Sequence, residues 1–434
     1  MNRPMTKIKT ITGNRKWLVN QQIKLVVFFY FTYRLLAGEI KPKYYIRFLM
    51  RLLFFLSKMN HNKYVMIGKR LKINLYVPGY PSRAFFNACR KVNEFEDKMP
   101  CVTALVSITS ACRFNCEHCY QKYDKGKDIG IEYVLDTVKK MQDNGVAFFN
   151  IEGGEPFLVF DRLKAVCDSI DMRSEILINS TGDGMTYDKL VELRKNKNLI
   201  GIMFSLHTDE PDKLNHFMGR DDAWDKLVNG INMCHQAGIA VMFNTCLLKP
   251  DFSNGRFEKI MDLSKQFNGA ILQLIKPKPA GGWLESGADR FDASDIARVK
   301  EKVKFYNLNE QKKNYPFISC MLNEEDKSLF GCTAGGTDRF YINAKGDVQP
   351  CEFLNLSFGN LKSEDFEVIY SRMREEFHVP GDCLLCEKYS RKILNLFREH
   401  KLNTLPLSCE LSKLVYKDWD RGEPADFYKK VEEI

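Results

Sequence analysis

The middle of the chain alternates short apolar runs with longer amphipathic ones. Six runs rich in β-branched and aromatic residues have the length and composition of strands buried on both faces: 103–109, 147–153, 175–181, 200–207, 239–247 and 271–277. Between them lie segments with helical periodicity, several of which end in glycine, as helix C-termini often do. This succession of strand–helix units predicts an α/β fold whose parallel sheet forms a partial (β/α)6 TIM-type barrel.

Two apolar runs precede the barrel pattern, one from Leu25 and one from Tyr44. Arginines interrupt both, so neither reaches the roughly 20 apolar residues that a membrane span needs. Residues 1–75 hold 16 Lys and Arg against one acidic residue, Glu39, although the whole chain has a net charge of only +10. The segment therefore predicts helices that lie in a membrane interface, with an anionic membrane surface as partner. One alternative is helices that pack on the barrel. RNA binding explains the charge but not the apolar residues, which disfavours nucleic acid as a partner.

Beyond residue 277 the strand–helix rhythm ends. The run NAKGD at 343–347 predicts a β-hairpin. We therefore expect a basic, apolar helical segment at 1–75, a linker at 76–100, the barrel at 101–316, and a small domain of a β-hairpin and helices at 317–434.

The cysteine content indicates a reducing compartment. Fourteen cysteines in 434 residues are too few for a disulfide scaffold, and no secretory signal pattern opens the chain. We expect a cytoplasmic protein, held peripherally on the inner face of the membrane by its first segment. Clustered cysteines in such a protein bind metal or act in redox chemistry.

The densest cysteine cluster, Cys112, Cys116 and Cys119, has the spacing C-x3-C-x2-C and directly follows the first predicted strand. A closed zinc or iron–sulfur site takes four protein ligands, so three leave one metal position open for another molecule. The alternative is a zinc site completed by His118 or His207.

Two further polar motifs follow the second and third predicted strands, GGEP at 153–156 and NSTG at 179–182. Because barrel sites form on the loops after the strands, we expect all three motifs on one rim. The cysteine spacing, the aromatic Tyr120 after the last cysteine, GGEP and the strand–helix units together resemble the radical SAM superfamily.

This resemblance implies a [4Fe–4S] cluster on Cys112, Cys116 and Cys119, whose fourth iron binds the amino and carboxylate groups of S-adenosylmethionine. A reductant such as flavodoxin or ferredoxin would supply the electron that cleaves this cofactor to a 5′-deoxyadenosyl radical, which takes hydrogen from substrate. The resemblance also assigns contacts with S-adenosylmethionine to Tyr120, Gly153, Gly154, Glu155, Asn179, Ser180 and Ser205.

A second set of cysteines flanks and follows the predicted hairpin: Cys332, Cys351, Cys383 and Cys386. Four thiolates suit a closed metal site, and the step from Gly346 to Cys351 resembles the SPASM or twitch extension of radical SAM enzymes. A full SPASM pattern continues with more cysteines, whereas only Cys409 follows Cys386 here. The resemblance thus implies one auxiliary [4Fe–4S] cluster, with Cys320 and Cys409 in reserve. Zinc is the alternative.

Two residues are candidates for acid–base catalysis. Glu352 directly follows Cys351, and resemblance to the anaerobic sulfatase-maturating enzymes implies a base there. His207 ends the fourth predicted strand and is expected at the barrel mouth. A solvated glutamate and a structural histidine are the alternatives. Lys276 and Lys278 could meet an anionic headgroup or a carboxylate, or stay solvated.

These features predict a radical SAM enzyme that acts on a lipid or lipid-linked molecule at a membrane surface. A SPASM-type peptide or protein maturase and a small-molecule dehydrogenase are the enzymatic alternatives. A non-enzymatic iron–sulfur electron carrier would need neither GGEP nor an open iron. The substrate itself is not predicted.

Overall fold

The centre of the molecule is a curled sheet with the strand order β10-β9-β8-β7-β6-β5-β4-β11-β12. The computed structural model describes residues 8–93, 101–287 and 290–434. Neighbouring strands from β4 to β10 are all parallel. They are β4 (Thr103–Ser107), β5 (Phe148–Glu152), β6 (Glu175–Ser180), β7 (Leu199–Ser205), β8 (Val241–Cys246), β9 (Ile271–Ile275) and β10 (Phe317–Cys320).

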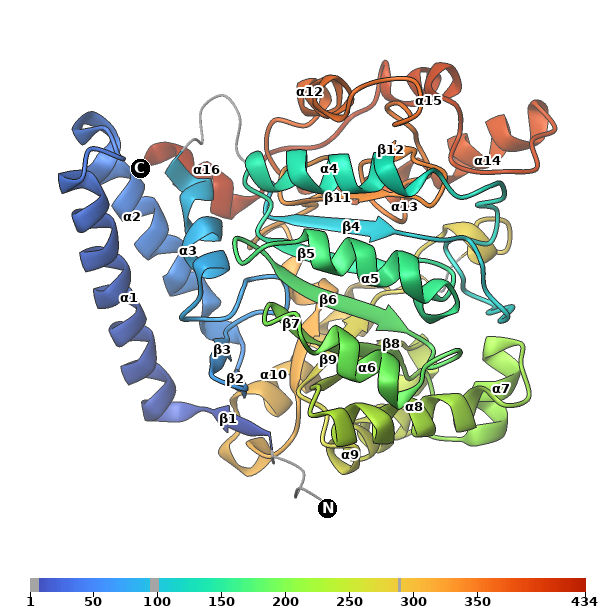
Figure 1. Cartoon of the computed structure of the whole chain (residues 1–434), viewed down its shortest axis with the longest axis horizontal. Coiled ribbons are helices and arrows are strands. Elements are labelled where there is room, and N and C mark those ends of the chain that lie inside the picture. Colours follow the sequence, from blue (N-terminus) through green and yellow to red (C-terminus); the bar gives the residue numbers. More distant parts are fainter. Residues whose placement is uncertain (1–7, 94–100, 288–289) are drawn as a thin grey trace.

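Helices cover the outside of this sheet, which confirms the predicted partial barrel (Figure 1). The amphipathic pattern drives this packing: α4, for example, turns Val134, Val138 and Met141 into the core. The helices are α4 (Ile131–Asp143), α5 (Phe160–Ser169), α6 (Tyr187–Leu193), α7 (Pro211–Met218), α8 (Ala223–Ala237), α9 (Arg256–Gln266), α10 (Ala293–Leu308) and α11 (Met321–Glu324). Short 3₁₀ turns join them: η3 (Pro156–Val159), η4 (Lys249–Phe252), η5 (Gly281–Trp283) and η6 (Glu310–Lys312).

The sheet continues past the six predicted strands. Strand β10 pairs with β9, and β11 (Arg339–Ile342) pairs in parallel with β4 and antiparallel with β12 (Val348–Gln349). The predicted hairpin therefore exists, but it extends the barrel sheet, which runs across the expected boundary at residue 317. The division into domains stays a prediction. The remaining helices are α12 (Phe366–Glu376), α13 (Leu385–Lys388), α14 (Ser390–Glu399), α15 (Cys409–Tyr416) and α16 (Asp426–Glu433).

The N-terminal segment covers the end of the barrel where the strands begin (Figure 1). Val65 and Leu75 pack there among barrel residues such as Phe148, Leu177 and Ile271, which closes the floor of the barrel. The expected linker at 76–100 includes a helix, and residues 94–100 of it lie outside the described residues. The elements are β1 (Lys9–Ile11), α1 (Gly13–Leu36), α2 (Pro42–Lys58), η1 (Met59–His61), β2 (Tyr64–Ile67), β3 (Arg70–Lys72), α3 (Arg83–Cys89) and η2 (Arg90–Asn93).

Part of the basic excess of this segment is buried in the barrel floor. The Lys72 ammonium is fully buried and bonds the Glu175 carboxylate at 3.1 Å, and Arg70 reaches the other oxygen of Glu175 at 3.1 Å. Lys63 is also fully buried and donates to the carbonyls of Lys312 (2.7 Å) and Tyr315 (3.2 Å). The expectation that this charge faces an anionic partner is therefore wrong for these residues.

Helices α1 and α2 each bury one face. Ile23, Val27 and Phe31 of α1 pack with Phe48 and Leu52 of α2 in an apolar core that is separate from that of the barrel. The opposite face of α1 is apolar as well, yet it is exposed: Trp17, Leu18, Leu25, Phe28, Phe29, Tyr33 and Leu36. We call these seven residues the outer face. None of the helices in the described ranges combines the length and hydropathy needed to span a membrane.

Candidate functional site

The loop after β4 carries the first three cysteines and packs directly against GGEP at the end of β5. The amide of Gly154 donates to the Thr109 carbonyl at 2.7 Å. A Cβ on Gly154 would lie 2.3 Å from the Ala111 oxygen, and one on Gly153 would lie 2.6 Å from the Thr109 oxygen. Only glycine permits this approach, so both glycines let the loop after β5 pack closely on the cysteine loop beside Cys112.

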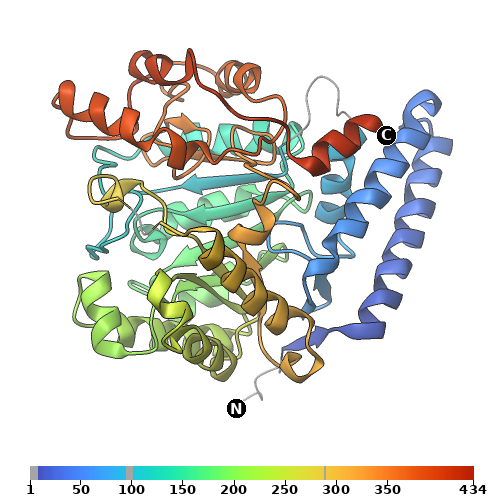
Figure 2. The ribbon, with the colours of Figure 1, turned by 180° about the vertical axis from the view of Figure 1, so that it is seen from behind.

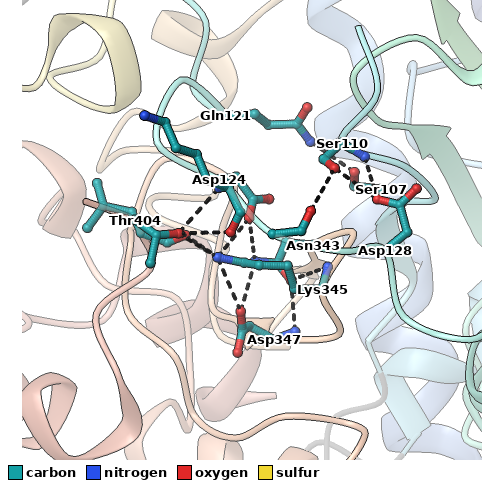
Figure 3. Close-up of polar contacts among 12 residues, drawn as sticks. Ser107, Ser110, Gln121, Asp124, Asp128, Asn343, Lys345, Asp347 and Thr404 are labelled. Carbon is teal, nitrogen blue, oxygen red and sulfur yellow. Dashed lines mark hydrogen bonds and ion pairs between the residues drawn. The ribbon is translucent and has the colours of Figure 1, made fainter. Parts of the chain in front are cut away.

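The cysteine loop is also tied to the β11–β12 hairpin by a polar network (Figure 3). Asp124 of the loop accepts a hydrogen bond from Asn343 Nδ2 (3.2 Å) and pairs with Lys345 Nζ (3.0 Å). Lys345 donates in turn to Thr404 Oγ1 at 2.9 Å. Burial raises the pKa of Asp124 to about 6. Residues far apart in the chain thus fix the loop that presents the thiols.

The thiols themselves form a three-donor set. Burial raises the pKa of Cys112 to about 11, and Cys119 lies close enough to raise it further. Within the described residues, no group of three or more His, Cys, Asp or Glu side chains is already placed to hold a metal ion. Three thiols on one loop suit an iron–sulfur cluster with one open position.

Glu152, at the end of β5, is the polar centre of the rim, and sequence reasoning missed it. Its carboxyl accepts hydrogen bonds from Tyr120 Oη (2.7 Å), Asn179 Nδ2 (3.0 Å) and Asn150 Nδ2 (3.2 Å). Burial, with a smaller contribution from the Glu352 charge, raises the pKa of Glu152 to about 8. Its place directly before GGEP, at a predicted strand end, was the signal that could have found it.

The amide oxygen of Asn179 is the other open feature beside Glu152. Asn179 Oδ1 is buried and accepts no hydrogen bond from the described residues. A buried acceptor without a donor indicates a missing ligand group. The structure thus brings Tyr120 and Asn179 together around one carboxyl, as the rim prediction required.

Glu155 and Ser180 bond each other and the protein backbone. Glu155 is fully buried and accepts from Phe157 N (3.0 Å), Ser180 Oγ (2.9 Å) and Thr181 (2.6 Å). Its carboxyl is therefore saturated by the chain itself and holds the loops after β5 and β6 together. Ser205 ends β7 and is half-buried.

His207 lies deep beneath the cysteine loop. Its Nδ1 accepts from the amide of Cys246 at 3.1 Å, which leaves the proton on Nε2, and Nε2 meets no partner among the described residues. Burial lowers the pKa of His207 well below its ordinary value, and the ring packs edge-on to His118 at 4.5 Å. His207 is thus a neutral donor at neutral pH.

Three of the four C-terminal cysteines, Cys332, Cys351 and Cys386, line one small cavity. Cys383 does not line it and lies instead beside Lys388, 3.9 Å from that ammonium. Of the reserve ligands, Cys320 is buried in β10, and Cys409 begins α15 and donates to the Phe358 carbonyl.

Glu352 lies next to two residues that line this second cavity, Cys351 and Arg339. It is only 8% exposed, accepts from the Cys351 thiol at 3.0 Å and lies 3.9 Å from Arg339 Nε. The alternative of a solvated glutamate is therefore wrong, and the carboxylate is held between a thiol and a guanidinium.

Lys276 and Lys278 both meet a carboxylate, and it belongs to the chain itself. Their ammonium groups lie 2.7 Å and 2.9 Å from the two carboxylate oxygens of Glu387. Glu387 belongs to α13, as Cys386 does. The lysines thus tie the loop after β9 to the second cysteine site and are neither solvated nor free to bind a headgroup.

Comparison with known proteins agrees with this geometry. Residues 106–264 match the radical SAM superfamily, and residues 332–388 match the SPASM iron–sulfur cluster-binding domain. A GTP 3′,8-cyclase of Campylobacter fetus subsp. fetus is 27% identical over 261 residues, covering 57% of this chain and 78% of the relative. An AdoMet-dependent heme synthase of Methanosarcina barkeri is 22% identical over 309 residues, covering 64% of this chain and 86% of the relative.

Among solved structures, Streptococcus suis SuiB bound to the precursor peptide SuiA has a similar fold. Its TM-score is 0.53 at 18% identity, over 75% of this chain and 80% of SuiB. At this identity the likeness concerns the fold alone.

Proposed function

The chain is a radical SAM enzyme with a SPASM domain, and from this premise we propose that it takes a hydrogen atom from a lipid-like substrate at a membrane surface. Bound to Cys112, Cys116 and Cys119, the [4Fe–4S] cluster with S-adenosylmethionine supplies the 5′-deoxyadenosyl radical. An auxiliary cluster belongs on Cys332, Cys351 and Cys386, with Cys383 as the fourth candidate.

The residues of the rim bind the cofactor and orient the groups around it. Gly153 and Gly154 let the loop after β5 pack closely on the cysteine loop, and Asn179 Oδ1 offers an acceptor to a ribose hydroxyl. Glu152, protonated below a pKa of about 8, holds Tyr120 and Asn179 in place. Glu155 positions the loops, whereas Glu352 and the neutral His207 are candidates to move or hold a proton at the substrate.

The exposed apolar outer face is the observation that supports a membrane surface. Phe29 is 66% exposed and Leu36 is 81% exposed, and the described basic residues Arg15, Lys41 and Lys43 at the same helix pair are exposed too. Exposed apolar residues gathered on one face of a helix mark an interaction site, and neighbouring cations favour anionic lipid.

Vesicle binding tests this surface. The full chain should sediment with phosphatidylcholine vesicles that contain phosphatidylglycerol, and the double variant Leu25→Ser/Phe29→Ser should bind at least tenfold more weakly. The matched control is Leu414→Ser, which removes a half-exposed leucine of α15 (50%). Equal binding by the double variant, or failure of the unmodified chain to bind, would contradict the proposal.

A further inference from the structure

A large cavity lies between the N-terminal helices and the barrel. The space free of atoms among its lining residues is about 1180 Å³, a volume that includes open solvent at its mouth. Its walls come from α2, α3, α16 and the inner side of β4, β9, β10 and β11. Figures 1 and 2 both place α16 beside α2, and Phe54 of α2 stacks on Phe427 of α16 with ring centroids 5.3 Å apart.

The outer part of this cavity is apolar. Helix α2 contributes Leu52 and Leu56, η1 contributes Met59, α3 contributes Phe85, and α16 contributes Phe427. A cavity of this composition favours the hydrocarbon part of a ligand, because its walls are apolar and carry few hydrogen-bonding groups.

The inner part of the cavity is polar and lies inside the barrel. The Tyr76 hydroxyl accepts a hydrogen bond there from Gln273 Nε2 at 2.7 Å. Arg339 and Glu325 line this cavity and also the cavity of Cys332, Cys351 and Cys386. One pair of side chains therefore separates the large cavity from the second cysteine site.

Two buried polar atoms at the inner part have no hydrogen-bond partner among the described residues. They are Thr103 Oγ1, on a residue 1% exposed, and Arg339 Nε, on a residue 9% exposed. Buried polar groups are normally satisfied, so these atoms point to a ligand that carries polar groups of its own.

The inner part also adjoins the second cysteine site, because Arg339 and Glu325 line both cavities. Arg339 Nε lies 3.9 Å from the Glu352 carboxylate, which accepts from the Cys351 thiol. A molecule that fills the cavity would thus end beside the second cysteine site.

We infer that this cavity binds the substrate, with its hydrocarbon part against α2, α3 and α16 and its polar end inside the barrel near Arg339 and Tyr76. The inference rests on the proposed function for the reaction, but the cavity itself is independent of the outer face. It assigns to the N-terminal helices a second role, as the wall of a substrate site that reaches the barrel from its floor.

The charges indicate the class of the polar end. Arg339 already bonds Glu325, and the other cation at the cavity, Lys91, already pairs with Asp338. Glu324 is bonded by Asn74 at 2.9 Å. With both cations neutralised, the site suits hydroxyl, carbonyl or amide groups better than a phosphate or carboxylate. The substrate class is a long-chain molecule with an uncharged hydrogen-bonding end.

Fluorescence of N-phenyl-1-naphthylamine, a neutral apolar probe, tests the cavity in the full chain without vesicles. The probe should bind the unmodified chain, and Ala88→Phe, which fills the cavity from α3, should weaken binding at least tenfold. Ala293→Phe, on an exposed residue of α10, is the matched control and should bind as the unmodified chain does. If the melting temperature or iron content shows that Ala88→Phe does not fold, Ala88→Leu replaces it, with a smaller loss expected.

Competition then tests the class of ligand. Dodecanol should displace the probe at least tenfold more effectively than dodecyl phosphate, and equal displacement would overturn the uncharged end. Absent probe binding, or equal binding by Ala88→Phe, would overturn the cavity as a site. The double variant Leu25→Ser/Phe29→Ser should keep probe binding. A chain that binds the probe but no vesicles would contradict the membrane surface and leave the cavity standing.

Discussion

The two ends of the barrel are built on opposite principles. At the end where strands finish, Asn179 and His207 each have a buried polar atom without a partner among the described residues, and one loop carries three thiols. At the end where strands begin, the charges of Lys72 and Glu175 are fully buried and satisfy each other. Buried charges at the floor therefore hold the chain together, and the open polar atoms of that end, Thr103 Oγ1 and Arg339 Nε, belong to residues that line the cavity.

This contrast follows from the parallel sheet. Loops after the strands vary freely and carry chemistry, while the opposite face contributes stability. Here the N-terminal segment supplies that face. Loss of its buried ion pair should therefore lower stability, whereas loss of a thiol or of the central carboxyl at the rim should lower activity.

The largest expected effect is at the rim. Replacing Cys112 with Ala removes one of three thiolates, so cleavage of S-adenosylmethionine to 5′-deoxyadenosine should fall below detection in chromatography of the reaction mixture. Cys167→Ala, at a buried core cysteine, is the control and should retain cleavage. Residual cleavage by the Cys112 variant would mean that the cluster lies elsewhere.

At the floor, Lys72→Met should destabilise the protein by about 3–5 kcal/mol, because it leaves the Glu175 carboxylate buried without its ammonium partner. Urea unfolding measures this change. Lys69→Met, at an exposed lysine next to β3, should change stability by less than about 0.5 kcal/mol. Similar losses for both variants would show that the floor does not depend on the buried pair.

Glu152→Gln should lower the rate of S-adenosylmethionine cleavage about 10- to 100-fold, the usual effect of losing a group that orients the binding residues. The amide keeps the size of the carboxyl but changes the bonds to Tyr120 and Asn179. Single-turnover kinetics measure the change. An unaltered rate with unaltered cofactor affinity would remove Glu152 from the site.

The last effect is a pH dependence of stability. Burial raises the folded-state pKa of Glu152 from 4.5 to about 8, so the folded chain keeps a proton that the unfolded chain releases. This contribution to stability is complete below pH 4.5 and is lost as the pH rises to about 8, by up to about 1.4 kcal/mol per pH unit. Relative to the unmodified chain, Glu152→Gln should gain stability over this range. Parallel urea-unfolding curves across the range would contradict the raised pKa.

Local patterns predicted the rim well. Cysteine spacing, GGEP and strand ends are all contiguous in the chain, so the partial barrel and the convergence of Tyr120 and Asn179 followed from them. Strand β10 was missed because four residues carry little periodicity.

The remaining features depend on contacts between distant residues. Lys72 and Glu175 are 103 residues apart, and Lys278 and Glu387 are 109 apart. No local pattern distinguishes such a lysine from a solvated one. The cavity beneath α2 also depends on distant segments, because α16 at the other end of the chain forms part of its wall.

The measurement that tests the central claim most directly is transfer of deuterium to 5′-deoxyadenosine. The reduced enzyme would be incubated with S-adenosylmethionine and, separately, with the lipid and the soluble fractions of fully deuterated cells, and the 5′-deoxyadenosine weighed by mass spectrometry. Deuterium arriving from the lipid fraction is the predicted result. Deuterium arriving only from the soluble fraction would contradict a lipid-like substrate and favour a peptide or a small molecule.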